Sequence, residues 1–281
     1  MPTPDNDLVP ARSGMLTSGD TWTVDLAGRD AFLRHHTLHG TPLLPAAMSL
    51  ALAAEAAHRP PPISFRNVVF HAPLYARATA AVSYRFVAQP PGMSIVVADA
   101  PAGPGQPPIG LTCANFELDD NPPDLPQPVG DHPDITYVTY GPYVATADLA
   151  MSGPFVTLAG LRVHLGDARA RYRPRLPADP AMFPDFAICA SLIDAMIQLA
   201  LVSLGAGHGG MNHLLPSSCD AIHVHTPCTD RQLLARHPSG IELHAHLGGN
   251  HSTDVLSWAE PQQPIAQIIG LRAVVLSRRD P

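Results

Sequence analysis

The run from Phe186 to Leu204 constrains the fold of this 281-residue chain more than any other feature. It reads FAICASLIDAMIQLALVSL, which is apolar over most of its length but carries Asp194 and Gln198 in its body. A charged side chain at the centre of a bilayer costs several kcal/mol, which argues against a membrane span. We therefore expect a helix buried on all sides within a folded protein. The expected location of such a protein is the cytoplasm.

Composition excludes several other classes of protein. Hydrophobic residues make up 46% of the chain and charged residues 15%, which predicts a packed core rather than disorder. The net charge of -7 and the scattered arginines argue against nucleic-acid binding. The chain has no lysine, so a Schiff-base or phosphate-loop lysine is excluded. The four cysteines form no CxxC pair, which argues against a structural zinc site or a disulfide framework.

Proline and glycine divide the first part of the chain into one helix and several strands. Residues 45–57 are rich in alanine and leucine, and Pro45 suits the first turn of a helix that Pro60–Pro62 ends. Alternating or apolar runs bounded by turn residues predict antiparallel strands. These expected strands cover residues 22–26, 63–74, 80–88, 93–98 and 109–118.

The same order recurs after a segment rich in proline and aspartate. We expect a linker at residues 121–142 between an N-terminal unit, 15–120, and a C-terminal unit, 143–281. The second unit has a weakly helical stretch at 143–151 and the apolar helix at 184–204. Its expected strands cover residues 155–165, 168–172, 221–226, 232–235, 240–247, 253–259 and 265–276. Each half therefore reads as one long helix against an antiparallel sheet, an α+β architecture.

Two groups of residues point to acid-base chemistry. His36 lies just before the first helix, and Asp194 and Gln198 share a face of the second because they are four residues apart. Burial raises the pKa of a carboxyl group, so Asp194 is expected to stay protonated unless it is paired. A neutral carboxylic acid donates a proton and a neutral histidine accepts one. Such a pair suits proton removal beside a carbonyl with expulsion of a β-hydroxyl.

The spacings His36-x3-Gly40-x4-Pro45 and Asp194-x3-Gln198 resemble those of the dehydratase domains of modular polyketide synthases. Four further segments resemble motifs of that family in the same order: the Ala-Pro-Leu end of 63–74, Gly153-Pro154-Phe155, Gly166-Asp167 and Leu215-Pro216-Ser217-Ser218. The resemblance covers most of the chain. It implies a double hotdog, with two antiparallel sheets each wrapped around a long central helix, and a free-standing member of the family.

The resemblance also implies a reaction. His36 would remove the α-proton of a β-hydroxyacyl thioester, while Asp194 would protonate the departing hydroxyl and Gln198 would orient it. Backbone N–H groups near Gly40 or at the start of the first helix, where Pro45 is a rigid cap, would stabilise the thioester oxygen. The expected supporting or substrate-binding residues are Gly153, Pro154, Leu215 and Pro216.

The substrate would ride on the phosphopantetheine of an acyl carrier protein or of a synthase. No metal or redox cofactor is expected, and the protein would be a monomer or a homodimer.

Several residues depart from the family pattern near the expected pocket. Ser152 stands where the family has tyrosine, His35 where it has aspartate, and Cys219 where it has an aromatic residue. Cys189-Ala190 replaces a His-Pro pair, and a separate Tyr140-Gly141-Pro142 lies too far from Asp194 to be the family motif. These changes keep three alternatives open: a cyclase that forms a cyclic ether, a double-bond isomerase, and a non-catalytic module that binds a carrier protein or an acyl chain.

Two histidine pairs belong to no family motif. His223 and His225, and likewise His244 and His246, each place two imidazoles on one face of an expected strand. The two pairs would form a zinc site only if their strands met. The same spacing is equally typical of a solvent-facing strand, and no metal site is expected.

Overall fold

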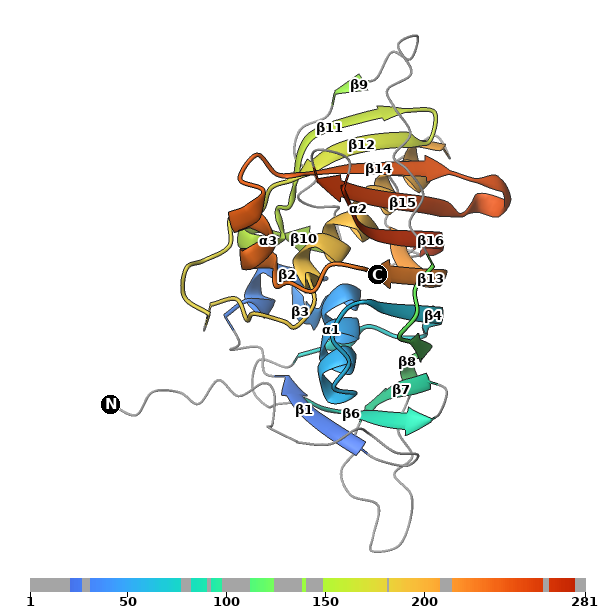
Figure 1. Ribbon diagram of the computed structural model, residues 1–281. Helices are drawn as coiled ribbons and strands as arrows, with labels where there is room; N and C mark the ends of the chain where they lie inside the picture. The colour runs from blue at the N-terminus through green and yellow to red at the C-terminus, as the bar shows by residue number, and fades with distance from the viewer. Residues whose placement is uncertain are drawn as a thin grey trace, which may run out of the picture.

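The computed structural model describes residues 21–26, 31–76, 82–89, 92–97, 112–123, 138–139, 149–180, 182–207, 214–259 and 263–275. Within these ranges a 12-stranded antiparallel sheet forms the frame of the molecule (Figure 1). Its strands, in spatial order, are β1 (Thr21–Leu26), β6 (Val82–Gln89), β7 (Gly92–Val97), β8 (Thr112–Asp119), β4 (Ile63–Phe70), β13 (Leu214–Val224), β16 (Gln263–Val275), β15 (Thr253–Ala259), β14 (Ile241–Leu247), β12 (Asp167–Tyr172), β11 (Leu158–His164) and β9 (Val138–Thr139).

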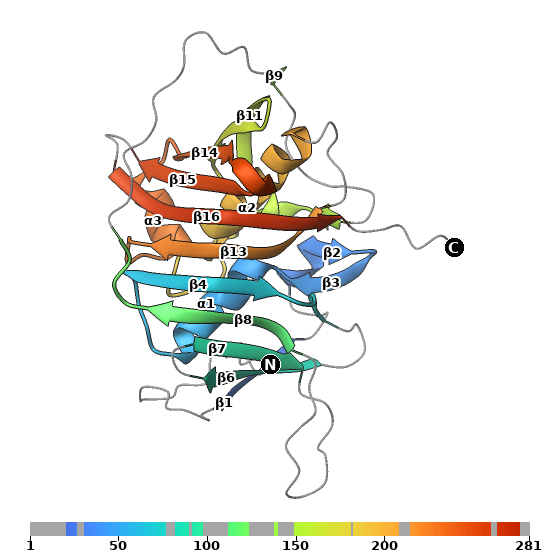
Figure 2. The ribbon, with the colours of Figure 1, turned by 90° about the vertical axis from the view of Figure 1, so that its right-hand side faces the viewer.

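Two long helices lie on one face of this sheet. Helix α1 (Ala46–Ala56) lies over β4 and β8, and α2 (Ala190–Gly207) packs on β11 to β16 and on α1 (Figure 2). The predicted burial of the second apolar run is confirmed, because residues 190–205 are all buried. No helix in the described part of the chain is long and apolar enough to cross a membrane. The predicted location in the cytoplasm stays a prediction.

The two hotdog sheets join edge to edge. Strand β4 of the first pairs antiparallel with β13 of the second, with Phe65 opposite Ile222 and Ser64 opposite His223. The Ser64 hydroxyl and His223 Nδ1 lie 2.7 Å apart across this junction, and both side chains are buried. The predicted double hotdog is confirmed, and its two sheets form one continuous surface.

A second, smaller sheet lies beside the helices. It has the order β10 (Leu149–Met151), β2 (His36–Leu38), β3 (Thr41–Leu44) and β5 (Leu74–Tyr75). A third helix, α3 (Asp230–Arg236), and the short 3-10 turns η1 (Leu33–His35), η2 (Gly153–Phe155) and η3 (Gly249–His251) complete the described elements. This small sheet draws strands from both halves of the chain, because β10 pairs with β2.

Helix α1 follows from its composition. Pro45 is extended (φ -57°, ψ 146°) and caps the helix, so it stands one position before the first helical residue rather than within the first turn. Its carbonyl accepts the N–H groups of Met48 and Ser49 at 3.0 and 3.1 Å. Nine of the eleven residues of α1 are buried, and most are alanine, which lets α1 approach α2 closely.

Some expected elements differ in the structure. Residues 232–235, expected as a strand, lie in α3, because Thr229 and Gln232 form a capping box that starts a helix. Residues 149–151 of the weakly helical stretch form strand β10, and 143–148 lie outside the described residues. The apolar helix begins at Ala190 rather than at residue 184.

The predicted division into two units stays a prediction. Residues 124–137 and 140–142 of the expected linker lie outside the described part of the chain. Residues 138–139 within it form β9, which pairs with β11 of the C-terminal half.

Two tight hairpins need glycine at a position of positive φ, and one of them also lacks room for a side chain. His39-Gly40 joins β2 to β3 and Leu165-Gly166 joins β11 to β12, and all four residues have positive φ, as a type I′ turn requires. A Cβ on Gly40 would meet nothing within 4 Å, but one on Gly166 would lie 2.8 Å from Leu247 Cβ.

Gly40→Ala is therefore expected to cost about 1 kcal/mol of stability, the usual price of a Cβ at positive φ. Gly166→Ala is expected to cost about 1 to 3 kcal/mol more, since Leu247 must also move. Urea unfolding of both variants measures the difference. Equal losses would show that the contact with Leu247 relaxes freely.

Candidate active site

A cavity of about 140 Å³ lies between the two halves of the chain. The polar side chains along it are His36, His71, Asp194 and Gln198, and the other lining residues are Leu43, Leu44, Ala46, Phe70, Ala72, Pro73, Leu74, Leu149, Met151, Ile197, Leu201, Leu215, Pro216 and Val274. The cavity therefore joins the predicted acid and base in an apolar surrounding.

The small sheet fixes the orientation of His36. This residue opens β2 opposite Met151 of β10, and its imidazole is 7% exposed. Its Nδ1 lies 3.2 Å from the carbonyl oxygen of Leu43, and its ring centroid lies 5.2 Å from that of Phe155. A carbonyl oxygen only accepts, so Nδ1 carries the hydrogen and Nε2 keeps a lone pair. Burial lowers the pKa of His36 to about 4, against the raising effect of the Leu43 bond.

Helix α2 holds Asp194 with the opposite shift. The carboxyl is 5% exposed, and burial raises its pKa to about 7. A hydrogen bond from Gln198 lowers this pKa, while the negative charge of Asp230 raises it further. Near pH 6 the cavity therefore carries a neutral imidazole and a protonated carboxyl.

Gln198 fixes the carboxyl through a complete set of hydrogen bonds. Its Nε2 donates to Asp194 Oδ2 at 2.7 Å and to the Phe155 carbonyl at 3.2 Å, while its Oε1 accepts from the Thr157 hydroxyl at 3.1 Å. Both amide hydrogens thus have protein partners, and Gln198 holds the carboxyl of Asp194 through Oδ2, which leaves Oδ1, with no hydrogen-bond partner in the described part of the chain, as the oxygen for the proton. The expected contact of Gln198 with a departing hydroxyl stays a prediction.

Gly153 and Pro154 act on the site through Phe155. They form the turn η2, with Gly153 at φ +54°, and neither lines the cavity. The turn places the Phe155 ring against His36, and it places the Phe155 carbonyl where it accepts a hydrogen bond from Gln198. Phe155 therefore touches both the base and the residue that orients the acid.

The other predicted site residues divide into two groups. Leu215 and Pro216, at the start of β13, line the cavity as substrate-binding residues should. Gly40 is exposed at the tip of the β2–β3 hairpin and is not part of the lining. Pro45 is buried as the cap of α1, and the next residue, Ala46, faces the cavity.

Two departures from the family pattern contact each other. His35 Nδ1 and the Ser152 hydroxyl lie 2.9 Å apart, and the Ser152 N–H donates to the His35 carbonyl at 2.9 Å. A Cβ on Gly153 would lie 3.0 Å from the same imidazole. This pair fixes the start of the η2 turn. Tyr140 lies outside the described residues.

Sequence reasoning missed His71. This side chain follows β4, lines the cavity and hydrogen bonds to Asn115 through Nε2. Its position just before the Ala-Pro-Leu of residues 72–74 was a usable signal, since that whole segment lines the cavity.

The two histidine pairs do not meet. Strands β16 and β15 separate β13, which carries His223, from β14, which carries His244. His244 bonds to Asp167 across the β12–β14 pair. Within the described ranges no three histidine, cysteine, aspartate or glutamate side chains group as metal ligands would.

Comparison with known proteins agrees with this geometry. A family model described as polyketide synthase dehydratase domain matches residues 8–98, about a third of the chain and the part that holds His36. No curated protein matches the sequence.

Solved structures match nearly the whole chain. The dehydratase domain from the CurF module of curacin polyketide synthase has a TM-score of 0.70 at 15% identity, covering 95% of this chain and 97% of that chain. A trans-AT polyketide synthase dehydratase domain from Brevibacillus brevis gives 0.70 at 15% identity, with 94% and 97% covered. The dehydratase domain of PpsC from Mycobacterium tuberculosis gives 0.66 at 17% identity, with 92% and 93% covered.

The fold is therefore the double hotdog of polyketide synthase dehydratase domains. The family model confirms the family resemblance inferred from the motifs over residues 8–98, and over the rest of the chain the solved structures share the fold.

The raised pKa of Asp194 predicts a pH-dependent stability. A carboxyl whose pKa is higher in the folded state stabilises the protein below its unfolded pKa, and this contribution is lost as pH rises through about 7. Asp194→Asn should remove the loss, which is on the order of 4 kcal/mol between pH 4 and 8. Urea unfolding of both proteins across that range measures the difference, with Asp179→Asn as the matched control. A difference that stays constant with pH would contradict the buried, protonated carboxyl.

Proposed function

We propose that this protein is a dehydratase-like enzyme that removes water from a β-hydroxyacyl thioester by acid-base catalysis. The observation that carries the proposal is the shared cavity, which holds His36 and Asp194 with pKa values moved in opposite directions. General acids and bases work best when each is in the right protonation state at one pH.

His36 is the proposed base. Because Leu43 holds Nδ1–H, the Nε2 lone pair is the one available to accept the α-proton of the substrate. The neighbouring Phe155 ring and the burial of the imidazole keep it neutral until it accepts that proton.

Asp194 is the proposed acid. As His36 Nε2 takes the α-proton, the electrons of that C–H bond form the Cα–Cβ double bond, and the bond from Cβ to its hydroxyl breaks. Asp194 Oδ1 gives its proton to the departing hydroxyl, which leaves as water. The products are an enoyl thioester and water, and a proton passed from His36 to Asp194 restores the starting state.

The thioester oxygen gains negative charge while the α-proton leaves. The start of α1 is the better placed of the two predicted donors, since Ala46 lines the cavity and Gly40 does not. The first N–H groups of a helix have no partner within it, and the dipole there favours negative charge. Pro45, held extended, fixes the direction of that first turn.

The proposed substrate is an acyl group on the phosphopantetheine of an acyl carrier protein or a synthase. The largely apolar lining suits an acyl chain, and the family resemblance supports the carrier. The step needs only proton transfers and so uses no metal or redox cofactor.

The CurK dehydratase, at a TM-score of 0.69, is described as inactive both with a histidine replaced by phenylalanine and with an aspartate replaced by asparagine.

The first test offers a synthetic β-hydroxyacyl pantetheine thioester, with and without a distal hydroxyl. Loss of water with new enoyl absorbance supports dehydration. Loss of water without that absorbance, only when the distal hydroxyl is present, indicates a cyclase. If the corresponding enoyl pantetheine thioester is offered instead, a shifted double bond at unchanged mass indicates an isomerase. No turnover together with tight binding indicates a non-catalytic module.

His36→Ala and Asp194→Asn are each expected to lower kcat at least 100-fold, since acid-base groups contribute about 10²- to 10⁴-fold. Product formation by mass spectrometry measures the loss. His246→Ala, on the exposed outer face of β14, is the matched histidine control and should keep full activity. Full rate in both cavity variants would refute the assignment.

The pH profile gives an independent prediction. His36 is a competent base only above its pKa of about 4, and Asp194 is a competent acid only below its pKa of about 7. The value of kcat/KM is therefore expected to form a bell between those limbs and to fall about tenfold per pH unit above pH 7. A rate that keeps rising to pH 9 would contradict Asp194 as the acid.

A further inference from the structure

The N-terminus of α2 has an unusual cap. Of its first four N–H groups, those of Ala190 and Ile193 donate to the carbonyls of Ile188 and Cys189 at 2.8 and 3.1 Å. The N–H groups of Ser191 and Leu192 both donate to the Asp230 carboxylate, at 2.8 and 3.0 Å. A helix usually takes its capping oxygen from the residue before it. Here that oxygen comes from α3, distant in the sequence.

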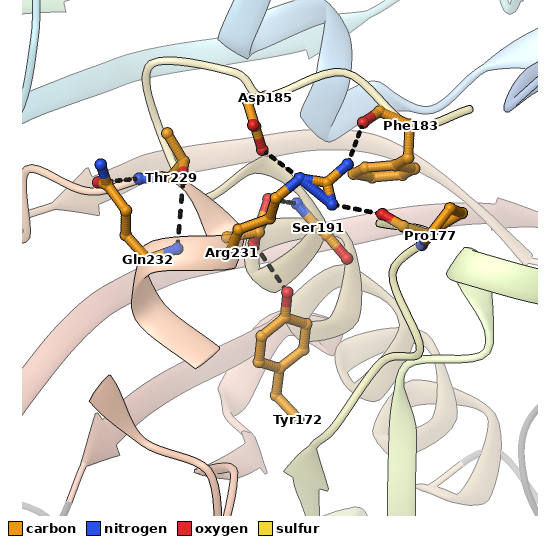
Figure 3. A network of polar contacts seen from close by, with 9 residues as sticks. Tyr172, Pro177, Phe183, Asp185, Ser191, Thr229, Arg231 and Gln232 are labelled. Carbon is orange, nitrogen blue, oxygen red and sulfur yellow. Dashed lines mark hydrogen bonds and ion pairs between the residues drawn. The ribbon is translucent and has the colours of Figure 1, made fainter. Parts of the chain in front are cut away.

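Asp230 is held firmly in this place. The Tyr172 hydroxyl donates to its Oδ1 at 2.8 Å, and Asp230 is only 3% exposed. Figure 3 shows Tyr172, Ser191 and Arg231 within this network of polar contacts. The capping box of Thr229 sets the start of α3. The next residue, Arg231, donates to the carbonyls of Pro177 and Phe183 and pairs with Asp185 at 2.9 Å. The carboxylate therefore keeps a fixed position against α2.

That position bears on Asp194. Asp194 lies two residues after Leu192, within about 3 Å along the helix axis, and side chains on a helix lean toward its N-terminus. The dipole at a helix N-terminus favours a charged carboxylate. Acting alone, it would leave Asp194 ionised at neutral pH, with no proton to donate. The carboxylate of Asp230 occupies the two N–H groups there and adds an opposing negative charge.

We propose that Asp230 is a positioning residue that keeps Asp194 protonated, by placing a second carboxylate on the N-terminal turn of α2. This rests on the proposed function, in which Asp194 is the proton donor. Asp230 touches neither the cavity nor the substrate, and it acts only through Asp194.

The surroundings of both carboxyls are consistent with this role. Asp194 faces Gln198 on its own helix and shares the cavity with His36 and His71. Burial raises the pKa of both carboxyls, but three donors, from Ser191, Leu192 and Tyr172, favour the charged form of Asp230, whereas Asp194 accepts from Gln198. The other ionisable groups near Asp230 are Cys189, Cys228 and Asp185, the last paired with Arg231.

The residue before α2 offers no strong cap of its own. Cys189 stands just before Ala190, and a thiol is a poor capping group. The structure gives α2 its cap through Asp230, beside that cysteine.

The test measures the titration of Asp194 directly, by carbon-13 NMR of the aspartate carboxyls, with Asp194→Asn to assign the signal. Asp230→Asn is expected to lower the pKa of Asp194 by about half a pH unit or more, since a like charge nearby is removed. If Asp230→Asn fails to fold, Tyr172→Phe decides. It removes a bond that favours the Asp230 carboxylate, so it should shift Asp194 in the same direction by a smaller amount.

Thr229→Ala is the structural control, because it weakens the cap of α3 and keeps both carboxyls. An unchanged titration of Asp194 in folded Asp230→Asn, or in Tyr172→Phe where that variant decides, overturns the proposal. An equal shift in Thr229→Ala also overturns it. The NMR readout needs no turnover. If the wild-type protein is inactive but Asp230→Asn still lowers the pKa of Asp194, this inference is upheld and the proposed function is refuted. In an active protein, the basic limb of the pH profile moves down with the pKa, and the rate at pH 8 falls about threefold.

Discussion

The burial of one carboxyl group, that of Asp194 on the apolar helix α2, constrains everything packed around it. Transfer of an ionised carboxylate into such a place costs far more than one hydrogen bond returns, so the group stays protonated. The N–H that Gln198 donates to Asp194 favours the charged form and offsets only part of the effect of burial, and the remaining groups of Gln198 bond to Phe155 and Thr157. The helix that carries Asp194 is buried along nearly its whole length, which keeps water from relaxing the shift.

Phe155 connects the two sides of the cavity. Its ring lies against His36 and its carbonyl accepts from Gln198, so one residue contacts both the proposed base and the side chain that holds the proposed acid. The turn that delivers it begins beside the His35–Ser152 pair. These two residues look like unrelated departures when only the sequence is compared with the family pattern. In space they are partners, and together they hold the start of the η2 turn.

Much of the fold and of the site could be predicted from the sequence. The apolar run with an internal aspartate fixed a buried helix, and proline-bounded alternating segments indicated antiparallel strands. The motif spacings predicted a shared site for five residues, and the structure places all five along one cavity: His36, Asp194, Gln198, Leu215 and Pro216. What the sequence reasoning missed has two causes, local signals that were not recognised and contacts between distant segments. Residues 232–235 have an apolar pattern that suits a strand, and only the capping box of Thr229 and Gln232 makes them helical.

The position of Gly40 and the cap of α2 were missed for different reasons. Local spacing places Gly40 near His36, but a two-residue hairpin turns it away to the surface. Nothing local in the sequence shows that the carboxylate of Asp230 meets α2, because the two segments are far apart in the chain.

The edge-to-edge pairing of β4 with β13 has a consequence for how such a chain can evolve. His36 lies before β4 in the sequence, and Asp194 lies on α2, between β4 and β13, so each half contributes one of the two groups to the cavity. A protein made of two identical halves would have to build both groups twice, at two mirrored places. In one chain each half needs only one of the two groups, so a substitution in either half alters the same cavity.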